Sequence, residues 1–238
     1  IHKWVGVILG LQFLLWALSG AVMALLDKDA VGGHGSHAAH VHPLPAETAF
    51  VDPARLRAYG PISGLALRDL AGRPVYELQT DKGIALADAT DGRRVTIDDK
   101  TALAVATMMH EAPARNLVRL DNHNLEAPDH MGPMWRVNFA DAENSSAYVS
   151  AETGRFLVMR GDTWRTWDFF WMLHNMDYVN RSSFNHPLII FVALGTLWLS
   201  GTGFYLLFKS FSRADFRWLR RRPGAPAGAG ACAPPPEG

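Results

Sequence analysis

The sequence predicts an α+β membrane protein in which two transmembrane helices flank one folded region outside the membrane. Two apolar runs predict the helices, and a sequence repeat between them predicts the folded region. The first run, Trp4 to Leu26, has no formal charge over its 23 residues, and a helix needs about 20 apolar residues to cross a bilayer. Backbone polar groups find no partners in hydrocarbon, so a spanning run of this kind is stable as a helix.

Few polar groups interrupt the first run. Gln12 and Ser19 are its polar residues, and each is expected to hydrogen-bond to a neighbouring helix. Gly6 and Gly10 form a Gly-x-x-x-Gly step, which allows close approach of another helix. A cleaved signal peptide is the competing interpretation, but its apolar region spans only about 7–15 residues. No small-x-small cleavage site follows this run, so we favour a membrane anchor.

The second apolar run, Pro187 to Phe208, is also uncharged and holds 22 residues. The positive-inside rule places the basic end of such a helix in the cytoplasm. Two spans then place both termini in the cytoplasm of a bacterium and the intervening region in the periplasm, beside the inner membrane. The basic residues that follow the run are Lys209, Arg213, Arg217, Arg220, Arg221 and Arg222.

Composition excludes several classes of function. The 23 basic and 23 acidic side chains give zero net charge, which argues against a nucleic-acid partner. The single cysteine, Cys232, excludes an intrachain disulfide and a cysteine-based metal site. No phosphate-binding glycine loop or serine-nucleophile motif is present, so hydrolase chemistry is not indicated.

Between the two apolar runs the sequence repeats itself. The stretch 74–97 resembles the stretch 136–159 in its short β-branched and aromatic runs. Each copy contains a tight turn, at Asp91-Gly92 in the first and Thr153-Gly154 in the second, and each of these glycines is followed by an arginine.

A helical stretch precedes each copy of the repeat, at 53–59 and at 100–109, and Asp98 and Asp99 are candidate caps of the second. The pattern predicts two units, each with a helix and about three antiparallel strands. Units of this size bury little core alone, so the two are expected to pack together. The predicted regions are helix 1–27, a His-rich linker 28–47, units 48–98 and 99–161, an interfacial helix 162–180, helix 185–212 and a basic, then disordered, cytoplasmic tail 213–238.

Five short motifs resemble those of one known family. They are the opening His2-Lys-Trp-Val-Gly6, the pair Leu173–Tyr178 and Phe184–Leu188 before the closing helix, and the turns Asp88–Gly92 and Ser150–Gly154. The turns resemble the Asp-x-x-Thr-Gly turn of the PepSY fold. The chain from residue 2 to 212 resembles the PepSY-associated transmembrane family of bacterial inner-membrane proteins.

The resemblance implies a periplasmic tandem of two PepSY-like units, with one departure in each turn. Asp91 stands where threonine is expected, and Ser150 stands where aspartate is expected. The resemblance also implies that some relatives are ferric-siderophore reductases with haem b between transmembrane helices. On this basis we identify His2, His174 and His186 as candidate axial ligands.

The predicted topology limits how these histidines can pair. His2 and His186 lie at opposite membrane faces, about 30 Å apart, so they cannot share one haem. His174 can pair with His186 if the segment 164–176 folds back as an interfacial helix. Alternatively, a twofold dimer brings two copies of His2 together on one side and two of His186 on the other, which gives two stacked haems. In the competing interpretation His186 only caps the helix that begins at Pro187, and His2 and His174 are interfacial side chains.

Two further sets of residues are candidate metal ligands. The linker carries His34, His37, His40 and His42 on a glycine-rich segment, where imidazoles can bind zinc or copper. A solvated polar linker is the alternative. A second, thioether-containing set lies in the second unit, at the end of its helix and in the loop of its repeat copy, and would suit Cu(I) if it converges: Met108, Met109, His110, His123, His130, Met131 and Met134.

The leading hypothesis is a b-haem electron-transfer component of ferric iron or siderophore reduction in the lipid bilayer. It is expected to act as a homodimer or within a larger membrane complex, with a ferric siderophore as a candidate partner. One alternative is a non-enzymatic periplasmic binding or regulatory module. The other is an accessory subunit whose glycine-bearing helices dock on a larger complex.

Overall fold

The structure is a computed structural model, and it describes residues 2–32, 48–178, 181 and 185–210. It confirms the predicted α+β class with two long apolar helices and two antiparallel sheets. The chain forms two compact units. One contains residues 10–189, and the other contains residues 1–9 with 190–238.

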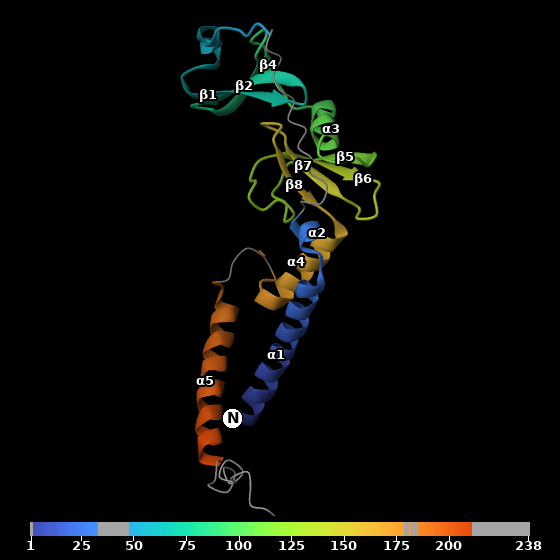
Figure 1. The fold of residues 1–238 in the computed structure, drawn as a ribbon. Coiled ribbons are helices and arrows are strands. Elements are labelled where there is room, and N and C mark those ends of the chain that lie inside the picture. Colours follow the sequence, from blue (N-terminus) through green and yellow to red (C-terminus); the bar gives the residue numbers. More distant parts are fainter. Residues whose placement is uncertain (1, 33–47, 179–180, 182–184, 211–238) are drawn as a thin grey trace, which may run out of the picture. The chain divides into compact units, whose positions relative to one another are not determined.

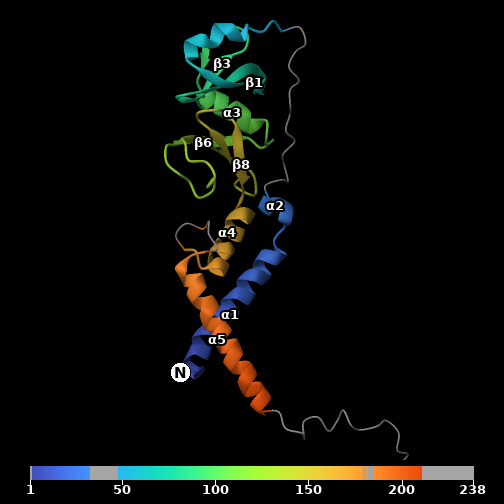
Figure 2. The same ribbon diagram turned by 90° about the vertical axis from the view of Figure 1, so that its left-hand side faces the viewer.

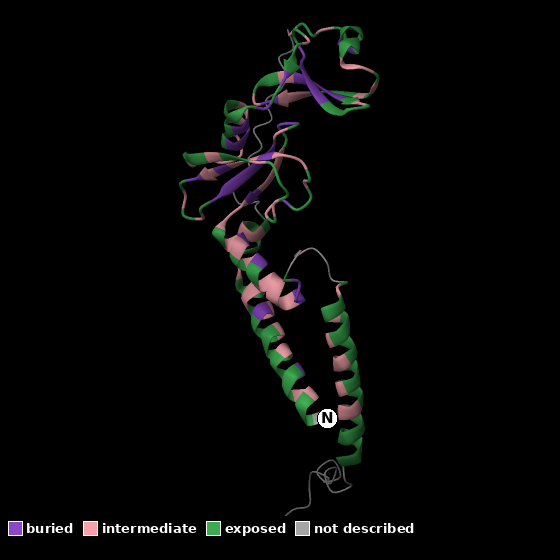
Figure 3. Ribbon diagram, turned by 180° about the vertical axis from the view of Figure 1, so that it is seen from behind, coloured by how far each residue is buried: buried purple, intermediate pink, exposed green. Residues whose placement is uncertain are grey.

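The two long helices are α1 (His2–Leu25) and α5 (Pro187–Ser210). The stretches Lys3–Leu25 and Pro187–Ser210 are each long and apolar enough to cross a membrane. Most of their apolar side chains are exposed rather than packed in a core (Figure 3). This exposure is typical of helices that lipid covers, because water-soluble proteins rarely present so large an apolar surface.

Small residues line the contact between α1 and α5 within the compact unit formed by residues 1–9 and 190–238. A Cβ atom at Gly195 of α5 would lie 3.5 Å from Leu9 Cδ1 of α1, and one at Gly6 would lie 4.0 Å from Leu199 Cδ1. Leu9 is buried as a result. A Cβ atom at Gly10 would meet nothing within 4 Å, so the predicted Gly-x-x-x-Gly step is not used as a whole among the described residues.

Each half of the folded region has one short helix and four strands, rather than the three strands predicted. Both sheets are antiparallel and ordered as their strands follow in sequence (Figure 1). The first half comprises η1 (Pro53–Tyr59), β1 (Ile62–Leu70), β2 (Arg73–Thr80), β3 (Gly83–Asp88) and β4 (Arg94–Val95). The second comprises α3 (Asp99–Thr107), β5 (Ala114–Leu120), β6 (Met134–Phe139), β7 (Ser146–Ser150) and β8 (Phe156–Arg160).

Equivalent turns in the two halves explain the sequence repeat. Gly92 N donates to Asp88 O at 2.9 Å, and Gly154 N donates to Ser150 O at 2.8 Å. Both glycines have positive φ, 75° and 65°, a region that strains other residues. In both turns the side chain of the first residue accepts a hydrogen bond from the backbone N–H two residues later. Thr90 N donates to Asp88 Oδ1 at 2.7 Å, and Glu152 N donates to Ser150 Oγ at 3.3 Å. A serine hydroxyl therefore performs the same role as the expected carboxylate.

The two halves share one hydrophobic core, as the small size of each unit predicted. Helix α3 lies between the two sheets (Figure 1 and Figure 2), and its Asp98 cap accepts from Thr101 N at 2.8 Å. Its apolar side chains contact both sheets. The shared core includes Leu70, Val75, Leu86, Val95 and Ile97 of the first half, and Ala102, Val105, Val137, Phe139 and Val149 of the second.

Ion pairs to a buried carboxylate also join the halves. Glu77 of β2 is 7% exposed and receives hydrogen bonds from Arg68 of β1 and from Arg155 of the second half. Arg68 also donates to the carbonyl oxygen of Thr153, in the turn before β8. The first half is therefore fixed to the turn that carries Gly154.

Candidate functional site around His174

Helix α4 (Asp162–Asn175) carries the candidate ligand His174 in its last turn. Its N-cap, Gly161, has no side chain to satisfy the first N–H groups. Glu143 replaces that cap, since its carbonyl oxygen accepts from Asp162 N at 2.8 Å and its Oε2 accepts from Thr163 N at 2.9 Å. A Cβ atom at Gly161 would lie 2.9 Å from the same Oε2, so only glycine allows this approach.

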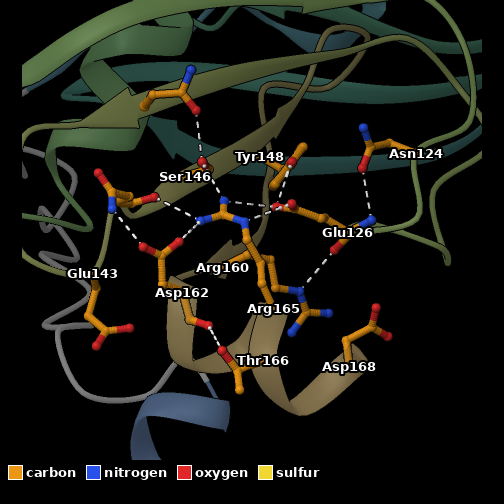
Figure 4. A network of polar contacts seen from close by, with 12 residues as sticks. Asn124, Glu126, Glu143, Ser146, Tyr148, Arg160, Asp162, Arg165, Thr166 and Asp168 are labelled. Atoms are coloured by element: carbon orange, nitrogen blue, oxygen red, sulfur yellow. Dashed lines mark hydrogen bonds and ion pairs between the residues drawn. The ribbon is translucent and has the colours of Figure 1, made fainter. Parts of the chain in front are cut away.

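A polar network fixes α4 to the second sheet (Figure 4). Arg165 Nε of α4 donates to Glu126 Oε1 at 2.9 Å, and Tyr148 OH of β7 donates to Glu126 Oε2 at 2.8 Å. Arg160 Nε of β8 donates to the Glu126 carbonyl oxygen at 2.9 Å. Burial raises the pKa of Tyr148, and the Glu126 carboxylate raises it further. Tyr148 therefore stays protonated and remains a donor.

At its other end, α4 packs against helix α1. Trp16 Nε1 donates to the carbonyl oxygen of His174 at 2.6 Å, and Ser19 Oγ lies 3.1 Å from His174 Nδ1. A Cβ atom at Gly20 would lie 3.4 Å from His174 Cε1, so the imidazole rests on a glycine surface. Ser19 is 2% exposed. Trp16, Ser19 and Gly20 are three and four residues apart, which places them on one helix face.

The hydrogen bonds of Ser19 assign the tautomer of His174. Its single hydroxyl hydrogen points back to the helix carbonyl of Leu15 at 2.6 Å, with Trp16 O at 3.1 Å. The oxygen is then available to accept from His174, and in the neutral imidazole with its proton on Nδ1 the lone pair lies on Nε2. Neutral histidine binds metals through such a nitrogen, and a hydrogen bond from the other nitrogen orients the ring.

The second candidate ligand, His186, reaches the same end of α4. Its Nε2 donates to the carbonyl oxygen of Asn175, which follows His174, at 2.7 Å. The helix ends there because Met176 adopts a left-handed conformation with φ 56°. An ion pair between buried Asp168 and Arg181 ties α4 to the connection that leads to α5. His186 thus hydrogen-bonds to the backbone of the residue that follows His174.

The donor set fits a haem ligand at His174, whose Nε2 is free in this tautomer. At His186 the Nε2 is engaged with the Asn175 carbonyl oxygen, and this bond has to break before that nitrogen can bind iron. Helix α1 begins at His2, but the side chain of His2 lies outside the described part of the chain.

The other candidate ligands are not brought together in the part of the chain that the structure describes. No group of three or more His, Cys, Asp or Glu side chains is arranged to hold a metal there. In the thioether-containing set, Met134 is fully buried, Met131 is 78% exposed, and His110 pairs with Asp141 at 3.2 Å. The linker histidines His34, His37, His40 and His42 lie outside the described residues.

The sequence predicted that Ser19 hydrogen-bonds to a neighbouring helix, and its contact with His174 of α4 confirms this prediction. It missed Trp16 and Gly20, although their spacing with Ser19 was the available signal. Gln12, the other polar residue of the first run, has a buried Nε2 without a hydrogen-bond partner among the described residues.

Comparison with known proteins gives one match. The family model described as the PepSY-associated TM region matches residues 1–227. No curated protein and no solved structure matches the chain. The match covers nearly the whole chain, including both apolar helices and everything between them, so this chain belongs to the PepSY-associated transmembrane family of membrane proteins.

Proposed function

We propose that the chain is a b-haem electron-transfer component of ferric iron or ferric-siderophore reduction, with His174 and His186 as the axial ligands. Two contacts near the end of α4 support the proposal: His174 lies against Ser19 of α1, and His186 hydrogen-bonds to Asn175, the residue after His174. Helix α1 is long enough to span a membrane. Paired histidines beside transmembrane helices are the usual ligands of membrane b haems.

The bound haem would supply one-electron transfer, and the chain's own residues would position it. Ser19 would orient the His174 ring through its contact with Nδ1, which leaves Nε2 for the metal. Trp16 fixes the backbone of His174 through its carbonyl oxygen. His186 would have to give up its hydrogen bond to the Asn175 carbonyl oxygen to hold the metal through Nε2. The glycine at position 20 lets the ring lie close against α1.

The direction of transfer follows from the charges that flank the spans. The basic residues after α5 favour a cytoplasmic C-terminus, so the folded region and His174 face the periplasm. Electrons would then move outward to a ferric acceptor. A homodimer, or a larger complex in the inner membrane, would bring in His2 and the donor side. The linker histidines His34, His37, His40 and His42 would bind zinc or copper, which a titration of the chain and of the fourfold alanine variant tests.

Absorption spectra of the detergent-purified chain, expressed with ample haem and recorded before and after dithionite, test the proposal. We expect a sharp reduced α-band that is lost in His174→Ala and in His186→Ala. His123→Ala is the matched control, because His123 is an exposed histidine of the folded region. A flat wild-type spectrum would overturn the proposal and leave the binding or accessory-subunit alternative, whose partner should then co-purify.

A further inference from the structure

A groove lies between the two halves of the folded region, far in sequence from the candidate ligand His174. Its volume is about 450 Å³. The first half contributes the start of β3 and the chain from Arg94 to Ile97, and the second half contributes Arg119 and the turn residues Ala151 and Glu152. Most of its surface is polar, so an apolar helix is not its natural occupant.

One wall of this groove is an unpaired strand edge. Strand β4 pairs with β3 only at Leu86 and Ala87. The chain then leaves the sheet, because Asp98 caps helix α3. Gly83, Ile84 and Ala85 continue to pair with β2 on their other side, but no strand lies beside them on the groove side within the described chain. Backbone N–H and C=O groups at such an edge can pair with an added strand.

Most of the charged residues around this edge are basic. Lys82, Arg94 and Arg119 line the groove, and Glu152 is the one acidic residue among the lining residues. Lys82 and Arg94 are exposed and have no ion-pair partner among the described residues. Arg119 pairs with Asp121, outside the groove, and stacks over Trp135, with its Cζ 5.6 Å from the ring centroid.

An apolar side chain completes the groove. Ile84 is 44% exposed on the face of β3 that the shared-core residue Leu86 also occupies. A strand added beside β3 would place alternate side chains on this face. Acidic side chains would meet the cations, and apolar ones would cover Ile84.

From these observations we infer that the groove binds an extended acidic peptide, which adds as a strand to the edge Gly83–Ala85 where β4 leaves it. The backbone edge supplies the pairing, and Lys82, Arg94 and Arg119 supply the selection for carboxylates. This site does not depend on the proposed haem function, since no residue is common to both.

The experiment measures fluorescence anisotropy of a labelled hexapeptide of alternating Glu and Val, added to the full chain in detergent. Two comparison peptides isolate the two features. One replaces Glu with Lys, and the other keeps the Glu–Val sequence but carries N-methyl groups on alternate amides. We expect saturable binding of the acidic peptide that is at least about tenfold weaker for each comparison peptide.

Paired charge reversals locate the site. Lys82→Glu with Arg94→Glu should weaken binding at least about tenfold, because both cations face the groove. The matched control is Arg55→Glu with Arg57→Glu on η1, where two exposed arginines lie away from the groove. Unchanged binding in the first double variant, equal binding of the N-methylated peptide, or no binding of the acidic peptide would each overturn the inference. The peptide comparisons need no variant, so they decide the question even if the reversed variant does not fold.

Discussion

Arg155 forms a two-point ion pair with Glu77 across the boundary between the two halves of the folded region. Arg155 Nη2 lies 2.8 Å from Glu77 Oε1, and Arg155 Nε lies 3.1 Å from Oε2. This two-point geometry is the strongest form of the arginine–carboxylate contact. Arg68 Nε reaches the same Oε2 at 2.8 Å, so one buried carboxylate holds two guanidinium groups from different halves of the folded region.

Glu77→Gln should therefore destabilise the folded region by about 1–3 kcal/mol, because it weakens charge-assisted hydrogen bonds to Arg68, which is largely buried, and to Arg155, which is more than half exposed. Thermal unfolding of the full chain in detergent, followed by β-sheet circular dichroism, measures the loss. Glu111→Gln is the control, since Glu111 is exposed and has no ion-pair partner among the described residues. The double variant Glu77→Gln with Arg155→Gln should lose less stability than the two single variants together. A loss equal to their sum would contradict direct coupling between the two residues.

Acid should destabilise the same region. Burial raises the pKa of Glu77, but hydrogen bonds from Arg155 and Arg68 outweigh it and hold the pKa below its usual value. Burial of Asp88 is likewise outweighed by Thr90 and Arg73, which lower its pKa to about 2. Both groups bind protons more readily when unfolded. Their stabilisation is complete above the ordinary pKa values of 4.5 and 3.8 and is lost as the pH falls below them, down to about 2 for Asp88.

A series of thermal melts between neutral pH and about pH 2 tests this dependence. The melting temperature of the wild type should fall steeply below the ordinary carboxyl range. Asp88→Asn should be less stable at neutral pH and should show a shallower fall, because one of the titrating groups is gone. Parallel curves for the wild type and this variant would show that Asp88 does not contribute.

Gly154→Ala should lower the stability of the folded region more than Gly72→Ala does, although both glycines have positive φ, 65° and 84°. A Cβ atom at Gly154 would lie 2.7 Å from Leu70 Cδ1 and 2.8 Å from Ile97 Cδ1, whereas one at Gly72 would meet nothing within 4 Å. We expect about 1 kcal/mol for the backbone conformation alone at Gly72. Overpacking of the shared core adds about 1–3 kcal/mol at Gly154. Equal melting temperatures for the two variants would contradict the packing described for that turn.

Ser19→Ala should change the proton position on His174. In the neutral imidazole of the wild type the proton is expected on Nδ1, because Ser19 Oγ donates to Leu15 O and can accept a hydrogen bond from Nδ1–H. Loss of a hydrogen bond worth about 1 kcal/mol shifts the ratio of the tautomers about fivefold towards Nε2–H. Nitrogen-15 spectra of the histidine-labelled chain report the two ring nitrogens separately. His123 provides an internal reference, and an unchanged His174 signal would contradict the tautomer assignment.

Much of the fold could be predicted from the sequence, because its strongest signals are local. Length and lack of charge identified α1 and α5, and the glycines at 92 and 154 identified the equivalent turns. Strand β1 was missed because its exposed edge position removes the alternation that marks a strand. The helical stretch at 53–59 is a 3-10 helix, which periodicity over seven residues cannot distinguish from an α-helix.

The site was harder to predict because its contacts are distant in sequence. Ser19 and His174 are 155 residues apart, and His186 bonds to a backbone carbonyl oxygen, which no side-chain pattern reveals. The fold-back of the segment before α5 was a stated alternative among several pairings. Trp16 and Gly20 are ordinary residues in a membrane span, so only the contact itself distinguishes them.

Helix α4 is anchored at both ends, and this has a mechanical consequence. Glu143 holds its first turn to the second sheet, and Trp16 holds its last turn to α1. With 14 residues the helix is about 21 Å long, and neither end has slack. We therefore expect a movement of the second sheet to displace His174 together with α4. A ligand that shifts the folded region would then also shift the position of His174 relative to α1.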